Sequence, residues 1–197
     1  MMKLFSFLGD RYHDKRSFFD VLCEALKKQF GSFQVEEGQN LEETLRENPD
    51  SIVIARWGLS ESGTFWLDEG LLQLLTRWLK DGGKLFVWHS GLARYPQSYA
   101  ELVGGRFIFH PERTSVRYFT EDGFSFEIFD EHYFVELRGN VEVFLWSESI
   151  FGRSTAGWKK SVGNGKILAL TAAHDEEGLK NEKFRRLLEK SLSWLFR

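Results

Sequence analysis

The sequence predicts an α/β fold whose sheet is mainly parallel and covered by helices on both faces. Short apolar segments alternate with segments of helical periodicity from the N-terminus to residue 88, and a strand followed by a helix closes the chain. Aromatic segments of strand character, with few helical signals, lie between residues 106 and 149. Strands separated by helices indicate right-handed crossover connections and a mainly parallel sheet. We therefore expect one domain over residues 1–197, with antiparallel strands added in its middle.

Four short apolar segments are predicted to form the parallel core, because each is rich in β-branched or aromatic residues and is followed by turn residues. They are residues 3–8 (KLFSFL), 51–55 (SIVIA), 84–88 (KLFVW) and 166–171 (KILALT). Residues 33–35 are expected to add a short strand. The turn Gly163-Asn164-Gly165 predicts a hairpin that joins residues 158–161 to the fourth core strand.

Helices are predicted where apolar residues recur every three or four positions. In the first of these segments Phe18, Leu22 and Leu26 share one face, and Gly31 supplies a stop. Asn48-Pro49 ends a short acidic helix, and Gly82-Gly83 ends the third. The predicted helices span residues 14–30, 41–47, 68–79 and 182–196.

Composition excludes several classes of protein. A chain of 197 residues, 42% of them hydrophobic, can bury a core without disulfides or a structural metal. Its 26 Lys and Arg against 29 Asp and Glu give a net charge of −3, which disfavours nucleic acid and membrane surfaces as partners. The single cysteine, Cys23, excludes an intrachain disulfide and fits a reducing compartment. Without an apolar run of membrane-spanning length or a signal peptide, we expect a cytoplasmic protein.

Histidines follow three of the predicted core strands. Ligands of open parallel sheets bind beyond the carboxyl ends of the strands, and His13, His89 and His174 all lie there. Imidazole suits proton transfer near neutral pH or metal ligation. Trp57 follows the second core strand, and a tryptophan ring pairs an apolar face with a polar edge, which matches a sugar.

Structural roles compete with these functional ones. His13 and Asp14 would be explained equally well as a cap of the first helix, because Asp is a favoured N-cap residue. His110 precedes a proline and would fit an extended edge position. Carboxylates that could orient the histidines are Asp130, Glu131, Asp175 and Glu176, although the Asp130-Glu131 pair would also fit a solvated turn.

A series of motifs then follows in a characteristic order. Tyr12-His13 comes first, then GGKLFVWHSG (82–91), YAELVGGRFIFHP (99–111), FDEHY (129–133) and AAHD (172–175). Their order and spacing resemble the trehalose-utilisation ThuA-like family over nearly the whole chain. The resemblance implies the class I glutamine amidotransferase-like fold, a flavodoxin-like three-layer sandwich with a mainly parallel sheet and added antiparallel strands.

The resemblance also implies that glutaminase chemistry is absent. His89 occupies the position of the cysteine nucleophile of glutaminases, and Cys23 belongs to a helix far away in sequence. Ser90 is the remaining alternative nucleophile, but it lacks the preceding glycine of a G-x-S-x-G elbow. His174 and Glu176 match the histidine and glutamate of glutaminases.

We therefore expect an enzyme of carbohydrate metabolism that acts on trehalose or a related sugar or keto-sugar, as a hydrolase or an isomerase. The expected catalytic groups are His89, Glu131 and His174; the expected substrate-binding residues around them are His13, Trp57, His110 and Tyr133. We expect His89, as a rim residue, to bury little apolar area. The expected partner is a small sugar ligand, and a homo-oligomer is compatible with the sequence.

Two other interpretations remain open. The first is a non-catalytic binding or regulatory protein that has kept an amidotransferase-like scaffold. The second is a metal-dependent hydrolase with His89, His110 and His174 as ligands of a divalent ion such as zinc. The sequence does not identify a cofactor. Convergence of the three histidines and Glu131 on one pocket would favour an enzyme.

Overall fold

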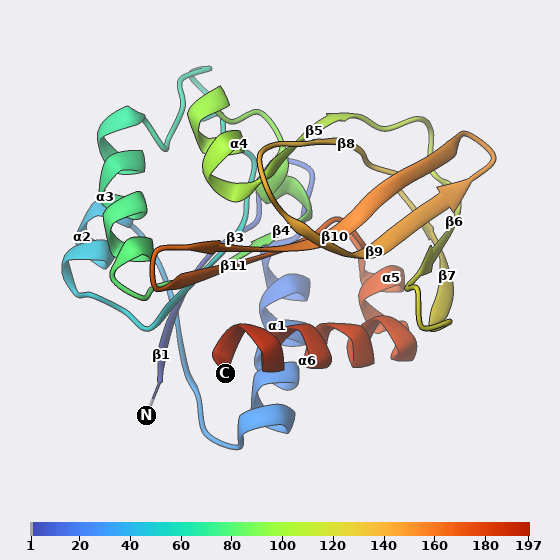
Figure 1. The fold of residues 1–197 in the computed structure, drawn as a ribbon, viewed down its shortest axis with the longest axis horizontal. Coiled ribbons are helices and arrows are strands. Elements are labelled where there is room, and N and C mark those ends of the chain that lie inside the picture. The colour runs from blue at the N-terminus through green and yellow to red at the C-terminus, as the bar shows by residue number, and fades with distance from the viewer. Residues whose placement is uncertain (1) are drawn as a thin grey trace.

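The protein, described over residues 2–197 by a computed structural model, contains one large mixed sheet with helices on both faces (Figure 1). The strands are β1 (Lys3–Leu8), β2 (Gln34–Glu37), β3 (Ser51–Ala55), β4 (Lys84–Trp88), β5 (Gly105–Phe109), β6 (Thr114–Phe119), β7 (Ser125–Asp130), β8 (Phe134–Leu137), β9 (Glu142–Ser149), β10 (Gly152–Val162) and β11 (Gly165–Leu170). The helices are α1 (Lys15–Phe30), α2 (Leu41–Arg46), α3 (Glu69–Lys80), the 3₁₀ turn η1 (His89–Leu92), α4 (Gln97–Val103), α5 (Glu176–Lys180) and α6 (Glu182–Phe196).

The first half of the sheet is parallel, as the sequence predicts. Its strand order is β2-β1-β3-β4-β11, and every neighbouring pair in it runs parallel. The edge strand β2 begins one residue later than expected and extends to Glu37. The predicted parallel core strands near Phe5, Val53, Phe86 and Leu168 are therefore confirmed.

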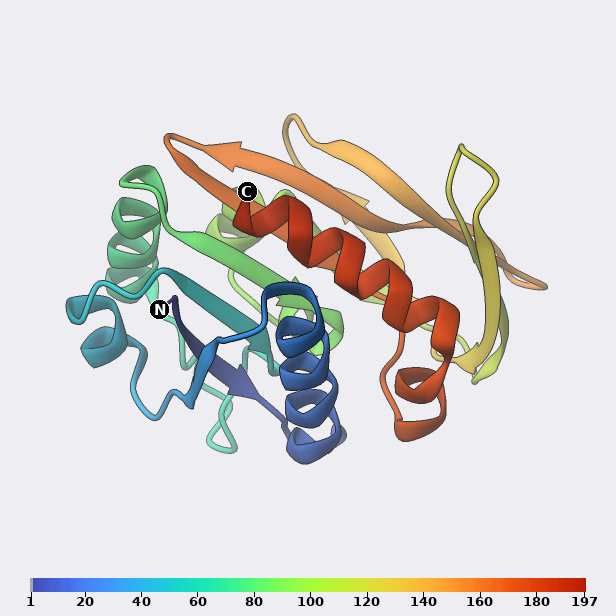
Figure 2. The same cartoon turned by 90° about the horizontal axis from the view of Figure 1, so that it is seen from below.

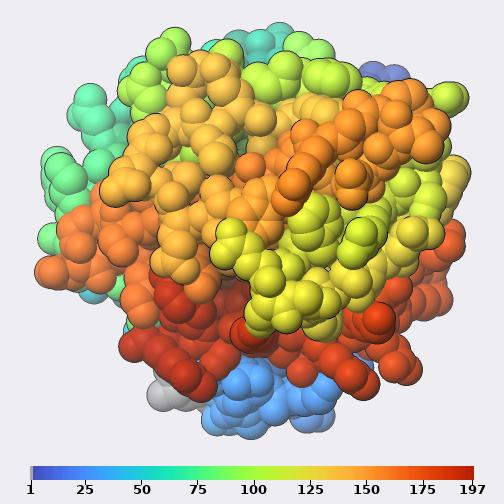
Figure 3. Space-filling model, turned by 45° about the vertical axis from the view of Figure 1, so that its right-hand side comes forward, coloured from blue at the N-terminus to red at the C-terminus, as the bar shows by residue number. Residues whose placement is uncertain are grey.

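The second half of the sheet is antiparallel and consists of β10, β9, β6 and β7. The predicted hairpin joins β10 to β11, with Val162 opposite Gly165. Strand β10 is longer than the predicted 158–161 because it pairs on both sides, with β11 and with β9. These added strands, yellow to orange, cover much of the face in Figure 3, above the red C-terminal helices.

Alternate residues of the core strands enter two separate hydrophobic cores, since successive side chains of a strand point to opposite faces. On one face, Leu4 and Phe86 pack with residues of α1, α5 and α6. On the other, Phe5 and Val87 pack with residues of α2, α3 and α4. Figure 2 shows α1 and α6 side by side on the first face, where they contact each other.

The four predicted helices form with their expected boundaries shifted by no more than a residue. Asp14 caps α1, because its carboxylate accepts a hydrogen bond from the backbone N–H of Ser17 at 2.8 Å. The short helices α4 and α5 and the turn η1 have too few residues to show helical periodicity in the sequence. No helix within residues 2–197 combines the length and the apolar character needed to cross a membrane.

A second sheet, formed by β5 and β8, packs against η1 at the carboxyl end of β4. It is antiparallel, with Gly105 opposite Leu137. His110 directly follows β5 and Tyr133 directly precedes β8, so this small sheet carries both residues to the edge of the main sheet.

Candidate active site

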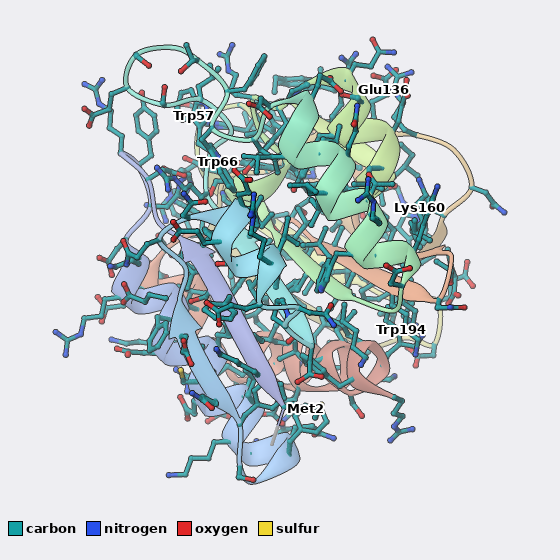
Figure 4. The ribbon with its side chains drawn as sticks, turned by 90° about the vertical axis from the view of Figure 1, so that its left-hand side faces the viewer. Met2, Trp57, Trp66, Glu136, Lys160 and Trp194 are labelled. Atoms are coloured by element: carbon teal, nitrogen blue, oxygen red, sulfur yellow. The ribbon has the colours of Figure 1, made fainter. Side chains whose placement is uncertain are left out.

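The imidazole rings of His13, His89 and His174 lie together at the carboxyl edge of the parallel strands. Ring centroids are 5.1 Å apart for His13 and His89 and 5.4 Å apart for His89 and His174. The centroids of His13 and His174 are separated by 6.2 Å. In Figure 4 this edge is the end of the sheet at which Trp57 is labelled, opposite Met2.

Asp10 orients His13 and connects two strand ends. Its carboxylate accepts a hydrogen bond from His13 Nδ1 at 2.7 Å and from the backbone N–H groups of Tyr12 and Trp57, both at 2.9 Å. Burial acts to raise the pKa of Asp10, but the hydrogen bond and charge of His13 and the two backbone bonds lower it to about 2. Since Nδ1 is engaged, His13 directs Nε2 away from Asp10, and this buried nitrogen has no hydrogen-bond partner among residues 2–197.

His89 sits on the sharp turn between β4 and η1, where its φ is 45°, a conformation that costs energy for residues other than glycine. Its Nδ1 donates to the carbonyl oxygen of Thr171 at 2.6 Å, and its ring stacks on Tyr133 with centroids 4.0 Å apart. The expectation that His89 buries little area is wrong, because 0% of the residue is exposed and β5 packs against η1, which begins at His89. This burial lowers its pKa, so the neutral form is favoured.

His174 is held by a buried carboxylate. Ala173, directly before it, has a φ of 65°, and its N–H donates to Asp130 at 2.8 Å. His174 Nδ1 donates to the other oxygen of Asp130, and the hydroxyl of Tyr118 donates to Asp130 at 2.8 Å. Burial acts to lower the pKa of His174, yet the hydrogen bond and charge of Asp130 raise it above its usual value.

Sequence reasoning did not include Asp130 in the catalytic group, although the pattern of residues along β7 indicates that this carboxylate is buried. Buried and exposed residues alternate along β7, and Asp130 has the same parity as Phe126 and Ile128. The pattern therefore places Asp130 on the buried face, where it is 0% exposed, and not in a solvated turn. Glu176, expected to partner His174, instead points outward and pairs with Lys180.

Glu131 completes the cluster from the loop after β7. Its Oε2 lies 3.4 Å from Nε2 of His89 and 3.9 Å from Nε2 of His110. One ring nitrogen each of His13 and His89 and a carboxylate oxygen of Glu131 form a set within 4.8 Å of one another. This set differs from the ligands His89, His110 and His174 expected for a metal site.

Aromatic side chains border the cluster on the side of the β1–α1 loop. Tyr12, 62% exposed, stacks on Trp57 with ring centroids 5.2 Å apart, and the guanidinium of Arg94 lies 5.8 Å from the Trp57 ring. A hollow of about 540 Å³, lined by residues 8–15, opens beside this stack. On the opposite side Tyr133 packs between His89 and Phe107. All seven residues expected at the site are therefore at this edge of the sheet.

One protein family model matches nearly the whole of this chain. The family model described as trehalose utilisation, ThuA, matches residues 9–195. The chain belongs to the ThuA family. No protein of curated function matches the sequence significantly.

Solved structures similar to this ThuA-family chain share its fold at low sequence identity. A ThuA-like protein from Parabacteroides merdae ATCC 43184 is 15% identical, with a TM-score of 0.70, 99% of this chain and 90% of that chain being covered. A ThuA-like protein from Bacteroides uniformis ATCC 8492 is 16% identical, with a TM-score of 0.72 over 98% and 90% of the two chains. A β-galactosidase from Bacillus circulans sp. alkalophilus is 12% identical, with a TM-score of 0.69 over 98% of this chain but 30% of the enzyme.

Two candidate nucleophiles of this ThuA-family protein lie outside the cluster or are inaccessible. Cys23 is in the middle of α1, and burial raises the pKa of its thiol. Ser90 is 1% exposed, and its buried hydroxyl lacks a hydrogen-bond partner in the described part of the chain. The remaining histidine, His132, is buried between the hydroxyls of Ser147 and Ser149.

A second hollow, of about 860 Å³, lies between α6 and the antiparallel strands. Trp194, labelled in Figure 4, lines it, but the ammonium groups of Lys159 and Lys166 lie 5.0 and 5.2 Å from the Trp194 ring. These cations lie against the Trp194 ring, and no histidine is among the described residues that line the hollow. The histidine cluster is therefore the stronger candidate for an active site.

Proposed function

We propose that this ThuA-family protein is an enzyme that transfers protons on a sugar or keto-sugar, such as trehalose or an oxidised derivative. The observation that carries the proposal is the pair of His174 and Asp130 beside His89 and Glu131. Asp130 occupies Nδ1 of His174, which leaves Nε2 as the nitrogen for substrate. An imidazole held this way by a carboxylate is an effective general acid or base, worth about 10²–10⁴ in rate.

His89 and Glu131 have complementary roles in the proposal. The carbonyl of Thr171 holds the proton of His89 on Nδ1, so Nε2 faces Glu131. The side chain of Glu131 is 20% exposed, which lets it reach a ligand, whereas His89 is enclosed. We assign proton transfer to His174 and binding of the reacting oxygen to Glu131, with the enclosed His89 as a positioning residue beside it.

A sugar is the ligand that best fits the border of the cluster. The exposed face of Tyr12, held by its stack on Trp57, offers the apolar surface that binds the face of a pyranose. Arg94 and His110 supply polar groups that can bind hydroxyls. The description of the family as trehalose utilisation supports the same class of ligand.

We also propose that the fold is flavodoxin-like and related to that of the class I glutamine amidotransferases. The parallel strands follow the order β2-β1-β3-β4-β11, which corresponds to the flavodoxin-like order 2-1-3-4-5 when β11 takes the fifth place. The positive φ of His89 at the end of β4 is also the strained turn that an amidotransferase elbow would need.

The test is a screen of trehalose, glucose and their keto derivatives by proton NMR, which detects hydrolysis, isomerisation and exchange of carbon-bound protons. We expect turnover by the parent protein and a loss of about 10²-fold or more in His174→Asn and Glu131→Gln. Glu176→Gln, on the exposed side of α5, is the matched control and should retain full activity.

Two results would contradict this function. Saturable binding of a sugar without any turnover would show a binding or regulatory protein. Turnover that survives in His174→Asn would show that the Asp130–His174 pair is not the proton-transfer group.

A further inference from the structure

Three groups of the histidine cluster have the arrangement of metal ligands. One ring nitrogen each of His13 and His89 and a carboxylate oxygen of Glu131 lie within 4.8 Å of one another. Nε2 is the nitrogen of His13 that has no hydrogen-bond partner among residues 2–197, and Nε2 is the nitrogen of His89 beside Glu131. Ligand atoms around a tetrahedral zinc ion are about 3.3 Å apart, given metal–nitrogen distances of about 2.0–2.1 Å. The Nε2–Oε2 distance of 3.4 Å between His89 and Glu131 already matches this spacing.

The hydrogen bonds behind the ligand atoms favour a metal. Nδ1 of His13 is bonded to the carboxylate of Asp10, and Nδ1 of His89 is bonded to the carbonyl oxygen of Thr171. Such outer partners place the proton on Nδ1 and leave the Nε2 lone pair for the ion, as in carboxylate–histidine–zinc triads. The cluster thus has the ligands and the supporting contacts of a built site.

An unpartnered nitrogen gives independent support. Nε2 of His13 is buried and without a hydrogen-bond partner among residues 2–197, while the His13 side chain is only 5% exposed. A buried polar atom without a partner costs about 1–3 kcal/mol. In addition, the lone pair of His89 Nε2 faces the carboxylate of Glu131, an arrangement that a shared cation stabilises.

We propose that His13, His89 and Glu131 bind a divalent transition-metal ion within the site of the proposed function. Two imidazoles and one carboxylate are a ligand set typical of catalytic zinc and of other first-row ions, and they leave a coordination position open. An oxygen of the sugar or a water molecule would take that position, where the ion lowers the pKa of a hydroxyl and polarises a carbonyl. The set contains no sulfur ligand, which disfavours copper(I).

The experiment measures metal binding directly. Protein without a histidine tag is treated with a chelator and then titrated with Zn²⁺ against a chromophoric competitor, and with Co²⁺ while its visible absorption is recorded. We expect one equivalent of either ion to bind per chain. Failure to bind a stoichiometric amount of either ion would overturn the proposal.

Variants distinguish this site from chance binding and from the proposed function. His13→Asn and Glu131→Gln should weaken Zn²⁺ binding at least about tenfold. Asp10→Asn, which changes the hydrogen-bond partner of His13 Nδ1 and removes no ligand, should weaken it about 10–100-fold. His174→Asn lies outside the ligand set and should keep full Zn²⁺ affinity while losing turnover. Unchanged affinity in His13→Asn and Glu131→Gln would refute the site even if the enzyme proved active.

A measurement on the parent protein covers the case in which a variant does not fold. X-ray absorption of the zinc-loaded protein should show nitrogen and oxygen neighbours with the multiple-scattering signal of two imidazoles. A spectrum with one imidazole or none would contradict the assignment of His13 and His89.

Discussion

His13 and His89 meet edge to face, with ring centroids 5.1 Å apart and ring planes at 69°, although they follow different strands of the sheet. Each ring donates its Nδ1 proton to an oxygen of the protein, His13 to Asp10 and His89 to Thr171. Because each Nδ1 is engaged in this way, Nε2 is the nitrogen that each ring leaves for a ligand. This arrangement is the basis of both the proposed enzyme and the proposed metal site.

Replacing Asp130 by Asn should destabilise the protein as well as impair the site. The carboxylate accepts from three donors, the Nδ1 of His174, the hydroxyl of Tyr118 and the N–H of Ala173. An amide nitrogen facing one of these donors leaves it unpaired, which costs about 2–3 kcal/mol of unfolding free energy. Thermal melting should show a Tm lower by about 5–10 °C.

The control for Asp130→Asn is Tyr118→Phe. It removes one donor and leaves the bond to His174 in place, so it should cost only about 1 kcal/mol. A melting temperature of Asp130→Asn equal to that of the parent would contradict the buried, ionised carboxylate.

Two substitutions of His89 should differ in stability but not in function. His89→Ala loses the bond to Thr171 and the stack on Tyr133 at a positive φ that alanine also disfavours, so we expect a loss of about 1–3 kcal/mol. His89→Asn tolerates this φ better and keeps a donor, so its loss should be smaller. Both variants lack Nε2 and should lose activity. Denaturant titrations measure the free energy of unfolding, and an equal value for His89→Ala and the parent would show that burial of His89 contributes little to stability.

Removing the Tyr12 ring should affect substrate binding but not folding. Tyr12 is largely exposed, so Tyr12→Ala should change the free energy of unfolding by less than about 0.5 kcal/mol. Loss of the stacking surface should raise KM about 3–10-fold with kcat retained, whereas Tyr12→Phe keeps the ring and should behave like the parent. Steady-state kinetics on the sugar that the screen identifies tests this, and an unchanged KM in Tyr12→Ala would remove Tyr12 from the binding surface.

Glutaminase activity should be absent, because the thiol of Cys23 is on α1 and not at the end of β4. Incubation with glutamine should release no ammonia above background. Cys23→Ser, and alkylation of the parent with iodoacetamide, should leave the sugar activity intact. Inactivation by alkylation with an unchanged melting temperature would point to a thiol-dependent reaction.

Gly91 keeps the turn after His89 in place through a close backbone contact. A Cβ atom at this position would lie 2.2 Å from the carbonyl oxygen of Ile54. Gly91→Ala should therefore cost more than about 3 kcal/mol. Gly70→Ala, in the first turn of α3 with only the Asp68 side chain nearby, is the control and should keep or raise the Tm.

Local patterns in the sequence were enough to locate the core strands and the long helices. The segments SIVIA and KLFVW become β3 and β4 because each is a continuous apolar run that only burial on both faces explains. Short elements such as α4 lacked enough residues to reveal a period, and they form only because the packed chain around them supplies their contacts.

Part of the candidate site could also be predicted from local sequence patterns. His13, His89 and His174 could be placed at one edge, because the carboxyl ends of parallel strands lie on one side of a sheet. The same argument applies to Asp10, which lies two positions after the end of β1. Asp130 could have been identified from the alternation of buried and exposed residues along β7.

The residues at the strand ends can be read from the sequence, whereas their pairing follows from the tertiary structure. Asp130, and not Glu176, holds His174, because the added antiparallel strands bring the end of β7 against the end of β11. His89 is buried, and not exposed at a rim, because the ring of Tyr133 stacks on it and β5 packs against η1, which begins at His89. Both outcomes depend on contacts between residues far apart in the chain, and local periodicity carries no information about such contacts.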